Sequence, residues 1–169
     1  MIYRTDSGRR LANIYRVDTN TLPKGREMQA VAAPGDWMPA QAMSQGVEMT
    51  APITTTGPLR FEGAYDGGAL TVWRVMRNAD APLSIMAHLV DAQGRVVSGA
   101  DGLGVPVEAW QVGDMIVQKH AFKTSDLAPG KYWIETGTYR LDTMERYRIL
   151  QSDQVVGDRL LLASIEVKP

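Results

Sequence analysis

His88 and His120 are the only imidazoles in the sequence, so they are the first candidates for metal chemistry. Asp91, Asp101 and Asp114 are the carboxylates expected nearest to them if the strands pack as a sandwich. Two histidines and a carboxylate suit zinc or iron. Metal-binding histidines usually lie only a few positions apart, whereas these two are 32 positions apart. We therefore expect hydrogen bonds to hold both rings, and we predict no metal site.

The same three aspartates are also the nearest approach to a calcium site. Together with Gln93, Asp91, Asp101 and Asp114 could supply part of the six to eight oxygen ligands that calcium takes. The loop 91–94 has fewer acidic residues than an EF-hand loop, and aspartates in turns commonly accept hydrogen bonds from their own backbone. We expect turn-capping aspartates and no cofactor.

Hydrolytic catalysis would need a nucleophile beside a base, or two carboxylates about 5–9 Å apart. The sequence has no Gly-x-Ser-x-Gly motif. The glycine-rich stretch 99–104 precedes no helix that could hold a phosphate. The glutamates that could pair are expected to face solvent, and they are Glu62, Glu108, Glu135 and Glu166. The sequence therefore predicts that the protein is not an enzyme.

Aromatic side chains remain, because flat rings can stack on the apolar faces of sugars. Trp73 and Trp133 lie mid-strand and are expected in the core. Tyr139 is similar to the tyrosines that tie the corners of sandwiches. Trp110 lies in a loop, where we expect it to close one end of the core, with sugar stacking as the alternative. The candidate ligand-binding residues are Trp110, Asp101, Tyr139 and His88.

Short strands must position these residues. After residue 58, apolar and β-branched runs alternate with Gly, Pro and Asp turns about every 8–15 residues. The expected strands are 59–65, 70–76, 83–90, 95–98, 115–123, 131–139, 147–150 and 160–167. In the last of them, a period of two places on one core-facing side Leu161, Ala163, Ile165 and Val167.

This pattern predicts an all-β protein, an antiparallel immunoglobulin- or fibronectin-like sandwich of about eight strands. An up-and-down barrel is the alternative. Before residue 58, closely spaced prolines oppose a long helix and leave one or two helical turns at 39–45. We expect an irregular segment over 1–57 that packs on a sandwich over 58–169.

The composition of the chain argues against several classes of partner. The 169 residues carry 18 Lys+Arg and 19 Asp+Glu, a near balance that gives no electrostatic reason to bind nucleic acid or an anionic membrane. No apolar run exceeds four residues, whereas a membrane span needs about 20, and no signal peptide is recognised. There are no cysteines, which excludes disulfides and thiol catalysis. We predict no nucleic-acid partner and no direct membrane insertion.

From residue 59 onward, several strand and corner motifs follow one another in an unusual order. They include Leu70-Thr71-Val72-Trp73, the stretch from His88 to Val97, Trp110-Gln111-Val112-Gly113-Asp114, Leu127-Ala128-Pro129-Gly130-Lys131-Tyr132 and Gly137-Thr138-Tyr139. In order and spacing, this part of the chain resembles the soluble C-terminal β-sandwich domain of bacterial membrane glycosyltransferase-like proteins of the mannosyltransferase type. Arg140 departs from that pattern, which has an acidic residue directly after the tyrosine.

The resemblance implies a non-catalytic, extracytoplasmic accessory or interaction module associated with a glycosyltransferase-like membrane protein. Its partner would be a glycan or a membrane protein, and no catalytic residue is carried over. The alternative, which rests on the residues alone, is a carbohydrate-binding module that uses loop aromatics.

Overall fold

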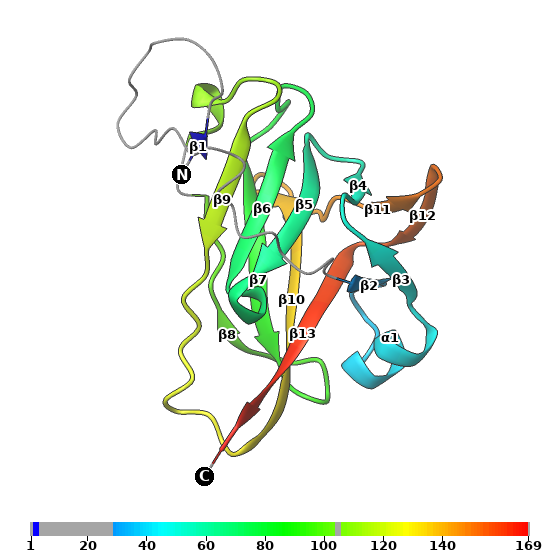
Figure 1. Ribbon diagram of the computed structural model, residues 1–169, viewed down its shortest axis with the longest axis vertical. Coiled ribbons are helices and arrows are strands. Elements are labelled where there is room, and N and C mark those ends of the chain that lie inside the picture. The colour runs from blue at the N-terminus through cyan, green and yellow to red at the C-terminus, as the bar shows by residue number, and fades with distance from the viewer. Residues whose placement is uncertain (1, 4–28, 104–105, 169) are drawn as a thin grey trace.

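The structure is a computed structural model that describes residues 2–3, 29–103 and 106–168 (Figure 1). In chain order, the elements are β1 (Ile2–Tyr3), β2 (Gln29–Ala33), α1 (Pro39–Gln45), β3 (Val47–Thr50), β4 (Thr54–Thr55), β5 (Leu59–Tyr65), η1 (Asp66–Gly68), β6 (Leu70–Val75), β7 (Leu83–Val90), β8 (Val96–Gly99), η2 (Val107–Ala109), β9 (Met115–Lys119), β10 (Gly130–Arg140), β11 (Ile149–Gln151), β12 (Gln154–Gly157) and β13 (Arg159–Val167).

The strands form three antiparallel sheets. One sheet has four strands in the order β1-β9-β6-β5, and a second has six in the order β3-β2-β13-β10-β7-β8. A small third sheet has the order β12-β11-β4. The all-β prediction is confirmed, and the expected strands at 59–65 and 83–90 have the same bounds as β5 and β7.

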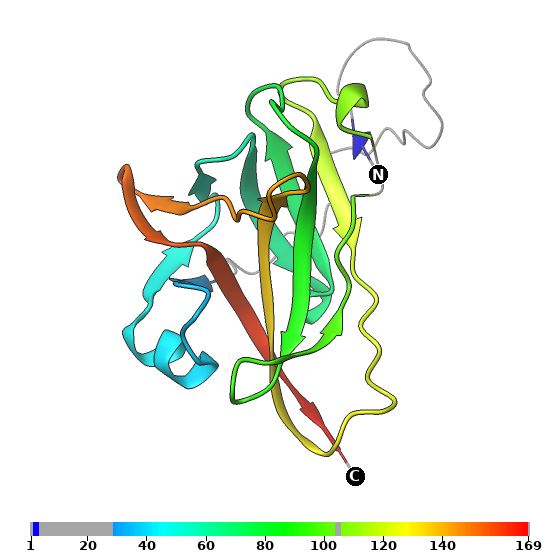
Figure 2. The same cartoon turned by 180° about the vertical axis from the view of Figure 1, so that it is seen from behind.

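The two larger sheets face each other and share one core (Figures 1 and 2). The core residues of the four-stranded sheet include Leu59, Phe61, Trp73, Val75 and Ile116. Those of the six-stranded sheet include Leu83, Ile85, Leu89, Ile134 and Leu160. Trp73 is fully buried, lies edge-on to Phe61 with ring centroids 5.1 Å apart, and donates its indole N–H to Thr71 Oγ1 at 3.0 Å. Trp73 therefore lies in the core, as expected.

The chain before residue 58 forms part of the sheets. β2 lies between β3 and β13, with Ala30 and Ala32 in the core. The predicted irregular segment thus contains two strands of the six-stranded sheet and, as expected at 39–45, the helix α1. Residues 1 and 4–28 of that segment lie outside the described residues. The closely spaced prolines of this segment favour an irregular chain. The strand β2 forms nevertheless because it pairs with β13, which is distant in the sequence.

A β-bulge at Leu162 divides β13 into two halves. Glu135 of β10 pairs with Leu161 and Ile134 pairs with Ala163, which leaves Leu162 without an opposite residue. A bulge shifts the alternation by one, so the residues on either side of it change faces. Leu161 therefore points away from the core, which corrects the prediction that it shares a face with Ala163.

The side of the six-stranded sheet that faces away from the core is called here the outer face; it includes His88, Glu135, Leu161, Lys131 and Trp133. The helix α1 packs on part of it through a small apolar cluster (Figure 2). The cluster consists of Val31, Ala33, Ala42 and Leu161, with Trp37 and Trp133 partly buried against it.

Candidate functional site

Three of the four candidate ligand-binding residues meet on the outer face. His88 lies on β7, and Tyr139 lies further along the neighbouring strand β10. Asp101 follows β8, and its carboxylate accepts the backbone N–H of Ala87 at 2.9 Å. His88 Nε2 lies 3.2 Å from Asp101 Oδ2, and the Tyr139 hydroxyl donates to the same oxygen at 3.1 Å. Strand pairing thus brings together residues that are 51 positions apart.

A buried ion pair extends this cluster toward α1. His88 Nδ1 lies 3.2 Å from Glu135 Oε1, and the other oxygen of Glu135 accepts a hydrogen bond from Arg159. Arg159 also donates to the backbone carbonyl of Trp37, ahead of α1. The side chains of Glu135 and Arg159 are 2% and 1% exposed. The expectation that Glu135 faces solvent is therefore wrong, because Arg159 and His88 compensate its charge inside the protein.

The electrostatics of the cluster follow from its contacts. Burial alone would lower the pKa of His88, but the hydrogen bonds and charges of Asp101 and Glu135 outweigh burial and raise this pKa to about 9. Burial would raise the pKa of Glu135, yet His88 and Arg159 hold it below its ordinary value. His88 is therefore an imidazolium at neutral pH, held between two carboxylates.

This charge state decides what the cluster can do chemically. A protonated imidazole cannot accept a proton, so His88 is not available as a general base near neutral pH. Burial and the nearby Asp101 raise the pKa of Tyr139, so its phenol stays protonated. A cation fixed by two carboxylates instead ties together three segments of chain, namely β7, β10 and the connection that carries Asp101.

His120, the second histidine, forms its hydrogen bonds with Thr71 and Ala100, and the charge of Asp101 acts on it. It is 2% exposed, and its Nε2 lies 2.8 Å from Thr71 Oγ1 while its Nδ1 lies 3.0 Å from the carbonyl oxygen of Ala100. Burial lowers its pKa, so the ring is neutral at pH 7. Hydrogen bonds hold both imidazoles, as the sequence analysis expects.

The other two metal candidates cap turns. Asp91 Oδ1 accepts the backbone N–H groups of Gln93 and Arg95 at 2.9 and 3.0 Å. Asp114 Oδ2 accepts the N–H of Gln111 at 2.8 Å. In the part of the chain that the structure describes, no group of three or more His, Asp or Glu side chains is arranged to hold a metal ion.

Trp110, the fourth candidate, is in the core, where it is 8% exposed. It directly follows η2. An open hollow of about 430 Å³ lies beside it, and Asp80 and Glu108 are among its lining residues. Because the indole is shielded, its ring offers no broad face on which a sugar could stack.

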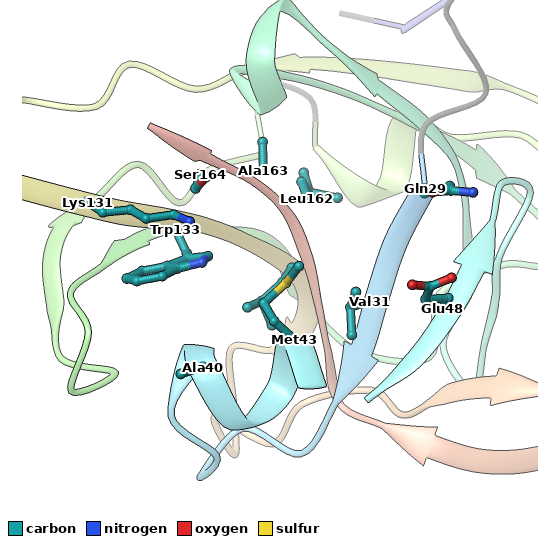
Figure 3. Close-up of a pocket in the computed structure, with 11 residues that line it drawn as sticks. Gln29, Val31, Ala40, Met43, Glu48, Lys131, Trp133, Leu162, Ala163 and Ser164 are labelled. Atoms are coloured by element: carbon teal, nitrogen blue, oxygen red, sulfur yellow. The ribbon is translucent and has the colours of Figure 1, made fainter. Parts of the chain in front are cut away.

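A pocket of about 480 Å³ lies on the outer face where β2 and β13 diverge (Figure 3). Its lining residues come from α1, β2, β3, β10 and β13, and they are Gln29, Val31, Ala40, Met43, Glu48, Lys131, Trp133, Leu161, Leu162, Ala163 and Ser164. The bulge at Leu162 forms one wall, because pairing with β2 stops at Leu161. The pocket thus follows from the end of strand pairing.

The pocket combines an aromatic ring with charges of opposite sign. Trp133, which the sequence analysis places in the core, is half-buried here, because its neighbour Ile134 occupies the core side of β10. The Lys131 ammonium lies over the Trp133 ring, 5.3 Å from its centroid. Glu48 lies across the pocket from them (Figure 3). Among the described residues, neither Lys131 nor Glu48 has an ion-pair partner.

Three features were not predicted from the sequence, and the reason is common to them: the burial of Glu135, its partner Arg159 and the pocket. Each depends on which strands pair, and a single sequence gives no pairing. The sequence holds one weak signal for the pocket. Lys131 and Trp133 are two positions apart, so both lie on one face of a strand.

Comparisons with known proteins give no relative. No family model matches the chain, and neither a curated protein nor a solved structure matches it significantly. The helix α1, with seven residues, is the longest described helix, and none of the described helices is long and apolar enough to cross a membrane.

Proposed function

We propose that this protein is a non-catalytic binding module whose ligand site is the pocket at Trp133. The carrying observation is the coincidence, in one pocket, of an aromatic ring and two charged side chains without ion-pair partners among the described residues. Pockets with a largely apolar wall and a few polar groups are the usual form of ligand sites. The non-catalytic part rests on the geometry around His88, whose two ring nitrogens both face carboxylates of the protein, those of Glu135 and Asp101.

The accessory role belongs to the same proposal. In the setting implied by the glycosyltransferase-like resemblance, the module acts outside the membrane and presents the pocket to a partner of that protein. The finer fold is also part of the proposal: the facing four- and six-stranded sheets are an immunoglobulin-like sandwich in the broad sense. The shared core and the antiparallel pairing support this interpretation.

Carbohydrate binding is the second candidate function, and Trp133 rather than Trp110 favours it. The Trp133 ring is partly open to the pocket, and Gln29, Glu48 and Ser164 supply polar groups that suit sugar hydroxyls. Trp110 lacks this combination because its ring is buried in the core.

Binding to glycan and peptide arrays tests the proposal. We compare the wild-type protein with Trp133→Ala and Met43→Glu, because Met43 lines the pocket and is 52% exposed. The matched control is Met76→Glu, a methionine 45% exposed outside the pocket. We expect at least about tenfold weaker binding, or 1.4 kcal/mol, for both pocket variants and none of this loss for the control.

Equal binding by all four proteins would overturn the proposal, as would the absence of binding by the wild type to any array. Melting curves accompany the arrays. A loss of binding counts only for a variant that melts within a few degrees of the wild type, and the exposed position of Met43 makes Met43→Glu the safer variant.

A further inference from the structure

Beside this pocket, part of β13 has an edge that is paired with none of the strands the structure describes. β2 pairs with Arg159, Leu160 and Leu161 only, while β10 pairs with β13 from Leu160 through Val167 on the opposite edge. The six residues 162–167 therefore have one edge that no described strand covers (Figure 1). An uncovered edge presents backbone N–H and C=O groups that an added strand can pair with.

The surroundings of this edge suit an added strand on both of its faces. On the core side, Ala163, Ile165 and Val167 are only partly buried, so an adjoining strand would cover more of them. On the outer face, Ser164 is exposed and the pocket at Trp133 lies alongside. A strand placed here would direct alternate side chains to these two faces.

The length of the unpaired edge of β13 indicates how long an added strand would be. At roughly 3.3 Å per residue, six free residues give an edge of about 20 Å, the length of an ordinary strand. The first two residues of β2, Gln29 and Ala30, pair with β3 but not with β13. An extended segment could therefore continue along β13 in the place that β2 leaves.

The charges of Lys131 and Glu48 favour one direction for an added strand. Lys131 and Glu48 lie on opposite sides of the pocket, and neither has an ion-pair partner among the described residues (Figure 3). Lys131 pairs in register with Glu166, so it lies toward the C-terminal end of β13. Glu48 pairs with Val31, opposite the point where β2 leaves β13. A complementary segment carries an acidic residue toward Lys131 and a basic residue toward Glu48.

We infer that the partner is an extended peptide that adds to the free edge of β13 and inserts one apolar side chain into the pocket at Trp133. This inference rests on the proposed function and specifies its ligand class. Backbone hydrogen bonds along the edge supply affinity, while the pocket and the two flanking charges select the sequence.

The probe is a fluorescein-labelled nine-residue peptide with alternating β-branched residues and a central leucine. One version carries aspartate near its N-terminus and lysine near its C-terminus, and a second version has the two exchanged. Fluorescence anisotropy with the full chain measures binding. A segment that takes the place of β2 runs antiparallel to β13, so its N-terminal end lies near Lys131 and its C-terminal end near Glu48. We therefore expect the first version to bind at least about tenfold more tightly than the second, and equal binding of the two overturns the inference.

N-methylation of the peptide tests backbone pairing without altering the protein. Methylation of one set of alternate residues removes the N–H groups that face β13, whereas methylation of the other set removes those that face solvent. We expect the first change to abolish binding and the second to be tolerated. Equal effects of the two sets overturn the inference, because a ligand held by side chains alone would not distinguish them.

A charge exchange locates the site. Lys131→Glu should weaken the preferred peptide at least about tenfold and restore affinity when the peptide aspartate is replaced by lysine. Lys119→Glu is the matched control, because Lys119 is an exposed lysine on β9 of the other sheet. Absence of this rescue overturns the inference.

Failure of the inference is distinguishable from failure of the proposed function. Glycan binding that is lost in Trp133→Ala, without binding of either peptide, overturns the peptide inference and keeps the pocket as the ligand site. Sedimentation tests a second copy of the chain as the occupant. If the wild-type protein is a dimer and Met43→Glu is a monomer, a second copy occupies the pocket, and the peptide inference is overturned. If no array and no peptide binds, both proposals fall.

Discussion

Around His88 the outer face of the six-stranded sheet carries charges that neutralise one another, whereas around Trp133 the same face carries Lys131 and Glu48 without ion-pair partners among the described residues. Both regions are built on β10, only two residues apart at Trp133 and Glu135. The bulge lies opposite this point, between the partners of Ile134 and Glu135.

The comparison separates two surroundings on one strand: buried charges that are paired within the fold, and exposed charges beside the pocket of the proposed function. Buried charges must be compensated within the fold, because an unpaired buried charge is costly. Exposed charges beside a pocket cost little and remain available to a ligand. Substitutions in the two regions should therefore affect different measurements.

The largest effect is expected from Arg159→Met. This change leaves the buried carboxylate of Glu135 without its arginine partner and removes the donor to the Trp37 carbonyl. Loss of one member of a buried ion pair typically costs about 3–5 kcal/mol. Urea unfolding monitored by tryptophan fluorescence measures this loss.

The double variant Glu135→Leu/Arg159→Met is the control for that experiment. It removes both charges, so we expect it to be more stable than Arg159→Met alone. An Arg159→Met variant within about 1 kcal/mol of the wild type would show that the buried pair does not stabilise this region.

An intermediate effect is expected from pH. The folded state raises the pKa of His88 from 6.5 to about 9, so the folded protein binds this proton more tightly than the unfolded chain. The resulting stability is complete below pH 6.5 and is lost as the pH rises to about 9. Because the ring is 17% exposed and solvent screens its ion pairs, we expect a loss of about 1–2 kcal/mol.

His88→Gln should flatten this dependence in urea unfolding experiments at pH 6, 7.5 and 9. On the acid side the sign is opposite, because the pKa values of Asp101 and Glu135 are lowered, and stability falls as the pH drops below their ordinary values near 4. Equal slopes for the wild type and His88→Gln between pH 6.5 and 9 would contradict the assignment of the charge to His88.

The smallest effect on stability is expected from Lys131→Met. Lys131 is exposed, and its described partner is the Trp133 ring, an interaction worth about 0.5–1 kcal/mol at exposed sites. We expect a change within that range in the free energy of unfolding, measured in urea. A loss comparable to that of Arg159→Met would remove the distinction between the two regions.

The sequence predicts the strands of the core better than it predicts the outer face. β5 and β7 are identified because their alternation and bounding turns are local signals. His88, Asp101 and Tyr139 are individually selected as polar residues on or near strands, but their contact depends on the pairing of β7 with β10. Their assignment to ligand binding stays a prediction.

Two features could not be predicted from the alternation of apolar and polar residues. The bulge at Leu162 interrupts the alternation, and nothing in the run of three leucines shows which of them is the extra residue. The burial of Glu135 depends on Arg159, which is 24 residues away in the sequence and on another strand. Both features belong to tertiary structure.

The position of β2 between β3 and β13 also constrains how the protein folds. β2 lies near the start of the described chain and β13 ends at residue 167, so the two neighbouring strands are separated by almost the whole of the described chain. Pairing between segments this far apart in the sequence slows folding, because the loop must close before the contact forms. During synthesis on the ribosome, the pairing of β2 with β13 cannot form until β13 has emerged, so this part of the six-stranded sheet is completed late.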